Sequence, residues 1–166
     1  MARRADAVSF RTVHTNAFLW LRRTHLAVGL LAIVVFIGTG QYMDRVHDHL
    51  HGMPDVRRML FRSAHIYLLL SGLLNLALGL YLAGSSRPVG RLLQAIGSVF
   101  VLAGPALLLL AFVYEPWLTD LERPFARPAL YGALAGMLLH LAGHRPSASA
   151  RADGARGDRR LEHAGS

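Results

Sequence analysis

Residues 24–43, THLAVGLLAIVVFIGTGQYM, decide the fold, because 20 consecutive positions carry no Asp, Glu, Lys or Arg. A transmembrane helix needs roughly 20 predominantly apolar residues to cross the hydrocarbon core of a bilayer. We therefore predict that this stretch crosses a membrane as one helix.

Three further uncharged runs follow, of 24, 23 and 17 residues. Lipid cannot satisfy backbone polar groups, so only helices and closed barrels cross a membrane, and these Leu-rich runs are too continuous for barrel strands. The predicted fold is all-α, an integral membrane bundle of four transmembrane helices. The predicted spans are at about residues 24–43, 63–86, 92–114 and 128–144.

The flanking segments complete the predicted organisation. Residues 1–15 are polar and are predicted to be a loose N-terminal segment, ahead of a four-helix domain over 16–144. Residues 145–166 are rich in Arg, Ala and Gly and are predicted to form a disordered tail. After the first span no helix breaker occurs before Gly52, so the helix is expected to continue to that residue, with Asp55 capping the next.

The net charge of +8 orients the chain and does not indicate nucleic-acid binding, because no basic patch interleaved with aromatic residues is present. All 18 basic residues are arginine. A cytoplasmic N-terminus places twelve of them on inner segments and six on outer segments. The positive-inside rule therefore favours both termini on the cytoplasmic side.

Several functional classes are excluded by absent residues. With no cysteine, the chain has no disulfide, thiolate nucleophile, Fe–S site or cysteine-type zinc site. No HExxH motif, P-loop or Ser-His-Asp order occurs, and no span carries a central Asp, Glu, Lys or Arg. A catalytic role and proton-coupled transport are therefore the least favoured functions.

The first candidate site is the segment HDHLHGM, residues 47–53, on the predicted outer face. On a continuing helix, His47 and His51 form an i, i+4 pair that can chelate one ion. Imidazole with thioether ligands suits copper, particularly Cu(I). The predicted ligand set is Asp44, Met43, Met53, His47, His51 and His65. The alternatives are a solvated loop, whose arginines would repel a cation, and a protonatable patch.

The second candidate site is the pair His25 and His140, which the predicted spans place at similar depth near the inner surface. Two imidazoles from different helices at one level are the axial ligands of a six-coordinate haem b. Gly29 and Gly136 each lie four residues from one of these histidines and would let a porphyrin edge approach. The alternative is that each ring caps a helix or meets water at the interface.

Small residues repeat along the predicted spans at helical spacing. They predict close helix packing, or contact with a larger membrane partner or a second copy of the chain. Asn75, one turn after Ser71, is expected to form an interhelical hydrogen bond. Arg62 is expected to pair with Asp44, Asp48 or Glu115. The small-residue faces comprise Gly72 and Gly79, Gly97 and Gly104, and Gly132, Gly136 and Gly143.

The run GTGQYM, followed by RRMLFRSAHIYLLLSGLLNLALGLY, resembles a GTGxYM...RxxHIYxLL pattern of uncharacterised small bacterial four-helix inner-membrane proteins. The match covers residues 38–81, about a quarter of the chain. The resemblance implies a multi-pass protein of the bacterial inner membrane and no particular activity. It rests on Gly38, Gly40, Tyr42, Arg62, His65, Tyr67 and Asn75.

Three functional hypotheses follow. The leading one is an inner-membrane protein without a catalytic site that binds copper at the outer-face cluster. The second is a haem b electron-transfer protein that uses His25 and His140. The third is a ligand-free membrane subunit of a larger complex, which contacts its partner through the glycine faces.

Overall fold

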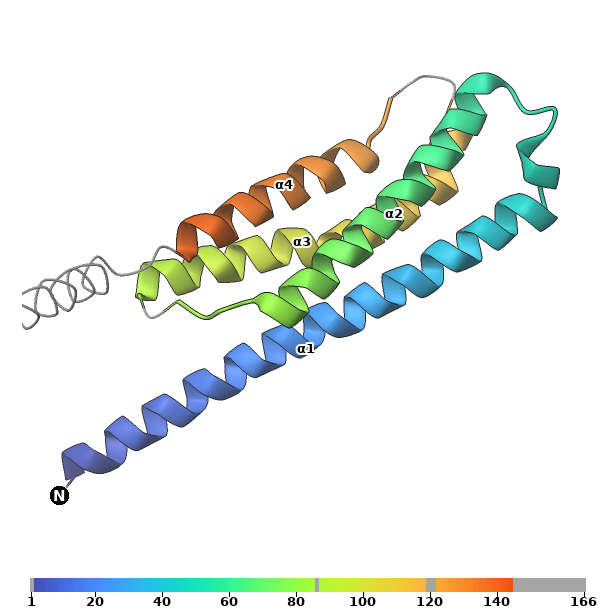
Figure 1. Cartoon of the computed structure of the whole chain (residues 1–166). Coiled ribbons are helices and arrows are strands. Elements are labelled where there is room, and N and C mark those ends of the chain that lie inside the picture. The colour runs from blue at the N-terminus through green and yellow to red at the C-terminus, as the bar shows by residue number, and fades with distance from the viewer. Residues whose placement is uncertain (1, 86, 119–121, 145–166) are drawn as a thin grey trace, which may run out of the picture.

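The computed structural model describes residues 2–85, 87–118 and 122–144, with side chains described from residue 18 onward. Four long helices account for most of this part of the chain, which contains no strand (Figure 1). The all-α prediction is therefore confirmed. The elements are α1 (Ala2–Arg45), η1 (Asp48–Leu50), α2 (Asp55–Tyr81), α3 (Pro88–Tyr114), η2 (Glu115–Trp117) and α4 (Ala126–Gly143).

The helices form two hairpins that pack against each other through α2 and α3. Helix α1 lies along α2, and α4 lies along α3, so α1 and α4 flank the central pair on opposite sides (Figure 1). Two clusters of buried apolar residues fill the interior. One surrounds Phe61, Leu68 and Leu108 near the start of α2, and the other surrounds Leu78 and Val101 toward its end.

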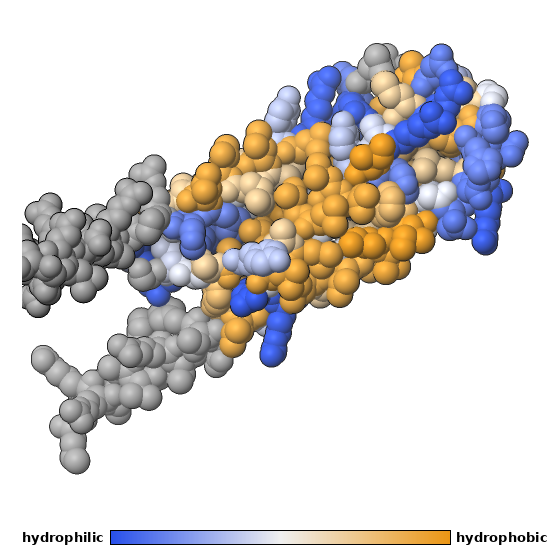
Figure 2. Space-filling model, viewed as in Figure 1, coloured by the Kyte–Doolittle hydropathy of each residue, from blue (hydrophilic) through white to orange (hydrophobic). Residues whose placement is uncertain are grey.

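Three helical segments are long and apolar enough to cross a membrane, namely Phe18–Arg45, Asp55–Tyr81 and Pro88–Trp117. Figure 2 shows a broad apolar band over the middle of the molecule, with polar side chains gathered toward its ends. In lipid this surface is solvated by hydrocarbon and needs no protein cover. The first three predicted spans each overlap one of these three segments over most of their length. The fourth coincides with α4, an 18-residue helix that is not among the three segments.

Glycines allow the two helices of each hairpin to pack at short distance. A Cβ added to Gly97 would lie 2.7 Å from the Gly136 carbonyl oxygen, and one added to Gly136 would lie 2.7 Å from that of Gly97. In the other hairpin, a Cβ on Gly29 would lie 2.9 Å from the Gly72 carbonyl oxygen. The predicted helix packing is confirmed, and these glycine faces are covered by helices of the same chain.

Two local predictions are wrong. Residues 2–15 are the first turns of α1 and not a loose segment, because no glycine or proline interrupts the chain before Gly29. At its other end α1 stops at Arg45, and Asp48, His49 and Leu50 adopt φ values of 44°, 55° and 66°. This left-handed turn delivers Leu50, only 2% exposed, into the cluster around Phe61. Burial of Leu50 offsets the cost of the unfavourable φ angles.

Two further predictions concern the helix cap at Asp55 and the C-terminal tail. Asp55 is the first residue of α2 and pairs with Arg58, while Pro54 occupies the cap position, so Asp55 is not the cap. The predicted tail over 145–166 lies outside the described residues.

A buried glutamate attaches the start of α4 to the end of α3. Glu115 is 0% exposed, and its Oε1 accepts hydrogen bonds from the backbone N–H groups of Phe125 (3.0 Å) and Ala126 (2.7 Å). Its Oε2 lies 3.6 Å from Arg123 Nε. Arg62 is exposed and does not take this partner, so the predicted pairing with Glu115 is wrong. Asp44 and Asp48 contact His49 and His51 instead.

We expect Glu115→Ala to destabilise the protein by about 1–3 kcal/mol, because it leaves backbone donors of α4 buried and unpaired. Glu115→Gln is the matched control, since its amide oxygen can still accept from Phe125 and Ala126. The measurement is thermal unfolding in detergent. Equal melting temperatures for the two variants would show that the acceptor oxygen does not anchor α4.

Candidate functional site

A small polar cluster lies in the apolar interior where all four helices contribute side chains. It consists of His25 from α1, Asn75 from α2, Ser98 from α3 and His140 from α4. Their exposed fractions are 0%, 0%, 1% and 6%. Buried polar groups are stable in an apolar interior only when they find partners, so the partners of each ring nitrogen decide what this cluster can do.

Asn75 fixes the orientation and tautomer of His25. Its Nδ2 donates hydrogen bonds to the backbone oxygens of Ser71 (2.9 Å) and Val101 (3.2 Å), which turns Oδ1 toward His25 Nδ1 at 2.8 Å. An amide oxygen only accepts, so Nδ1 carries the ring proton. The expected interhelical hydrogen bond of Asn75 is confirmed. His25 Nε2 is left buried with its lone pair available and no hydrogen-bond partner among the described residues.

His140 presents a second unpartnered nitrogen beside the first ring. Its Nε2 lies 3.2 Å from Ser98 Oγ, whereas its Nδ1 is buried without a partner in the described part of the chain. The His25 and His140 ring centres are 6.3 Å apart, with their planes at 72°. Buried polar atoms usually have partners, so these two nitrogens on neighbouring rings are candidate ligand atoms, as is His47 Nε2, which is also buried without a partner among the described residues.

The ring separation matches the geometry of two imidazoles on one metal ion. A metal–nitrogen distance of about 2.0 Å, plus roughly 1.2 Å from nitrogen to ring centre, places two opposed ligand rings roughly 6.4 Å apart. The observed separation is 6.3 Å. The spacing of the two ring centres is therefore compatible with a shared ion.

Within the described part of the chain, the His and Asp members of the predicted outer-face set do not form a group of three placed to hold an ion. His47 packs among the rings of Tyr42, Phe61 and Trp117. His51 Nδ1 donates to the Asp48 backbone oxygen at 2.7 Å. The cause is the left-handed turn after Arg45, which removes the expected i, i+4 helical spacing.

The other members of that set also have separate partners. His65 stacks on Phe36, with ring centres 4.1 Å apart, and its Nδ1 lies 2.9 Å from Thr39 Oγ1. Asp44 contacts His49 at 2.6 Å. Met43 and Met53 pack against the apolar cluster around Phe61. Across the described side chains no group of three or more His, Asp or Glu residues is placed to hold an ion.

No protein-family model, curated protein or solved structure matches this chain. Functional inference therefore rests on the buried histidine pair and its surroundings.

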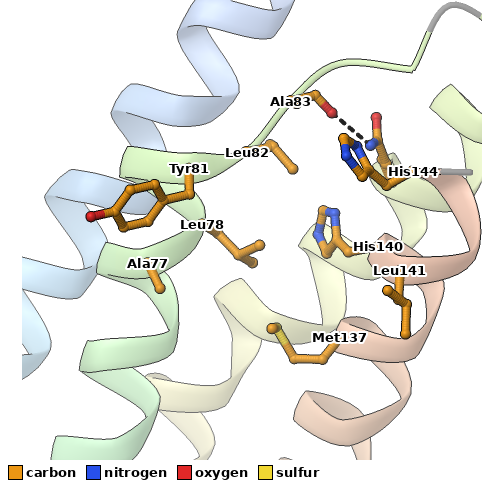
Figure 3. Close-up of a pocket in the computed structure, with 10 residues that line it drawn as sticks. Ala77, Leu78, Tyr81, Leu82, Ala83, Met137, His140, Leu141 and His144 are labelled. Atoms are coloured by element: carbon orange, nitrogen blue, oxygen red, sulfur yellow. Dashed lines mark hydrogen bonds between the residues drawn. The ribbon is translucent and has the colours of Figure 1, made fainter. Parts of the chain in front are cut away.

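The surroundings of the pair fit an ion better than a porphyrin. Gly29 and Gly136, which were expected to receive porphyrin edges, are covered by the backbones of α2 and α3. A cavity of about 300 Å³ reaches His140, and His25 is not part of its lining (Figure 3). A haem at this pair would have to displace Leu78 and Met137, which close the space between α2 and α4.

Sequence reasoning identified the two histidines but missed the residues that organise them. Ser98 carried no signal beyond being a polar residue in an apolar run. Met137 and His144 were detectable, because they lie three residues before and four residues after His140 and so share its helix face.

Proposed function

We propose that this chain is a non-catalytic, four-span protein of the bacterial inner membrane that holds one transition-metal ion between His25 and His140. The observation that carries the proposal is the pair of buried, unpartnered imidazole nitrogens on rings whose centres lie 6.3 Å apart. Metal-ligating histidines characteristically donate their other ring N–H to a fixed acceptor, as His25 does to Asn75. Imidazole ligands suit copper and zinc.

The proposed topology has α4 as the fourth span and both termini in the cytoplasm. Helix α4 lies along α3, which is itself long and apolar enough to cross (Figure 1). The arginine distribution of twelve inner against six outer residues supports this orientation. The histidine pair then lies in the cytoplasmic half of the bundle.

Haem b at the same two histidines is the second candidate function. It is favoured by the ring separation, since axial imidazoles on opposite faces of an iron have the same spacing. The closed packing around Gly29 and Gly136 weighs against it. Copper at the outer-face residues and a ligand-free membrane subunit are the alternatives that the experiment must distinguish.

The test is elemental analysis for copper, zinc, nickel and iron on the full chain, purified in detergent without a polyhistidine tag, together with an absorption spectrum. About one copper or zinc per chain, lost in His25→Ala and His140→Ala and kept in His47→Ala and His51→Ala, supports the proposal over copper at the outer face. Stoichiometric iron with a haem spectrum favours the second candidate. No retained metal, after copper and zinc are offered and the excess is removed, overturns both and favours the subunit.

We expect Asn75→Leu to weaken metal binding by about 10–100-fold, because His25 loses the acceptor that orients its ring and sets its tautomer. Asn75→Asp is the matched control, since it keeps an oxygen acceptor toward Nδ1. Affinity is measured by competition with a chromogenic chelator. Unchanged affinity in Asn75→Leu would show that the hydrogen bond serves helix packing alone.

A further inference from the structure

Three side chains on one face of α4 line the cavity beside the histidine pair. Met137, His140 and His144 are spaced by three and four residues, which places them on successive turns of the helix. The opposite wall comes from the end of α2 and includes Leu78 and Leu82 (Figure 3). The cavity therefore presents two imidazoles and a thioether against an apolar wall.

Exposure decreases along these side chains toward the buried pair. His144, the residue that caps the C-terminal end of α4, is exposed, and Met137 is half-buried. His140 is 6% exposed with Nδ1 unpartnered, and His25 behind it is 0% exposed. Along the axis of α4, a cation that enters from the C-terminal end of the helix meets His144 first and His140 one turn later, with Met137 one turn beyond His140.

The lining selects a soft cation of low charge. The lining contains no carboxylate. Its amide side chain, Gln94, already donates to the Ala83 backbone oxygen and accepts from the Ser85 backbone N–H in the loop after α2. Hard cations such as Mg²⁺ and Ca²⁺ require several oxygen ligands, whereas thioether with imidazole suits Cu(I). A monovalent ion is also less costly to desolvate in an apolar cavity than a divalent one.

We propose that this cavity is the entry route by which Cu(I) reaches the His25–His140 site, with His144 as the first ligand on the route and Met137 as a thioether ligand on the far side of His140. This inference rests on the proposed function and adds the class of ion and the end of the bundle from which it enters. That end carries the last turns of α2 and α4 and the start of α3 (Figure 1). In the proposed topology it faces the cytoplasm.

The test follows transfer of Cu(I) from a coloured bicinchoninate complex to the full chain in detergent without oxygen. Loss of colour reports the loading rate, and its end point reports the stoichiometry. We expect the double variant Met137→Leu, His144→Ala to load about tenfold more slowly and to reach the same end point as the unaltered chain. Leucine preserves the size of Met137 while it removes the sulfur.

The exposed loop histidine variant His51→Ala is the control and should load at the unaltered rate. If the double variant also loads at that rate, the route is wrong although the metal site stands. A lower end point at an unchanged rate would make these residues ligands of a separate site and would likewise overturn the route. If the unaltered chain takes up no copper, the proposed function itself fails.

Discussion

His25→Ala and His140→Ala should each reduce bound metal from about one ion per chain to none. Among the described residues, each substitution removes one of the two neighbouring buried imidazoles, so a single ring nitrogen of the pair remains for the ion. A single buried imidazole does not offset the cost of desolvating an ion. The measurement is metal content by elemental analysis after extensive dialysis.

Loss of metal through unfolding is distinguished by thermal denaturation without and with copper. Without metal, both variants should melt below the unaltered protein, because each leaves a cavity and a buried partner, Asn75 or Ser98, without its hydrogen bond. Only the unaltered protein should gain stability from the ion, by about 2.7 kcal/mol when the ion is present at roughly 100 times its dissociation constant.

His65→Ala is the matched control, because it deletes an imidazole from a spanning helix at a position with its own partners, Phe36 and Thr39. This variant should retain its metal. Retention in His25→Ala and His140→Ala would refute the site, and a coincident loss in His47→Ala or His51→Ala would return the assignment to the outer face.

Gly97→Ala and Gly136→Ala should each destabilise the protein by about 1–3 kcal/mol through overpacking. Each added Cβ would stand 2.7 Å from a backbone oxygen of the facing helix, so α3 and α4 must separate to accept it. The Cβ of Gly97→Ala would also lie 3.2 Å from His140 Cδ2. We therefore expect the same variants to weaken metal binding, because the shift moves the His140 ring.

Gly38→Ala provides the control for this pair. A Cβ at Gly38 meets no atom within 4 Å, and alanine in a helix is favoured over glycine by up to about 1 kcal/mol. Its melting temperature in detergent should be unchanged or slightly raised. If Gly97→Ala, Gly136→Ala and Gly38→Ala all shifted the melting temperature by the same small amount, the close contact between α3 and α4 would not determine the position of α4.

The histidine pair was predictable because the depth of a residue in the membrane follows from its distance along the sequence from the end of its predicted span. Counting residues from the predicted span ends placed His25 and His140 at one level, and helices that share a bundle bring such residues within reach of each other. The contacts of Asn75 with His25 and of Ser98 with His140 were not predictable together. They depend on how α2 and α3 are rotated about their axes, and this rotation is set by the glycines at which the helices touch.

The outer-face prediction assumed a helical spacing that the structure does not have. Its ligand geometry depended on α1 continuing through residues 46–52, where no local helix breaker precedes Gly52. The turn instead reverses the chain at Asp48–Leu50, against local backbone preference, so that Leu50 can enter the core. Burial of one leucine in a core formed by distant segments cannot be read from the loop itself.

The sequence by itself determined that this chain is helical and that three of its helices are long and apolar enough to cross a membrane, because hydropathy and span length are properties of single segments. The tertiary structure decided which polar groups meet. Helix contacts through Gly29, Gly72, Gly97 and Gly136 set the rotations that bury His25 beside His140 and leave one nitrogen of each ring without a partner among the described residues. Such contacts join residues far apart in the chain, and no local pattern specifies them.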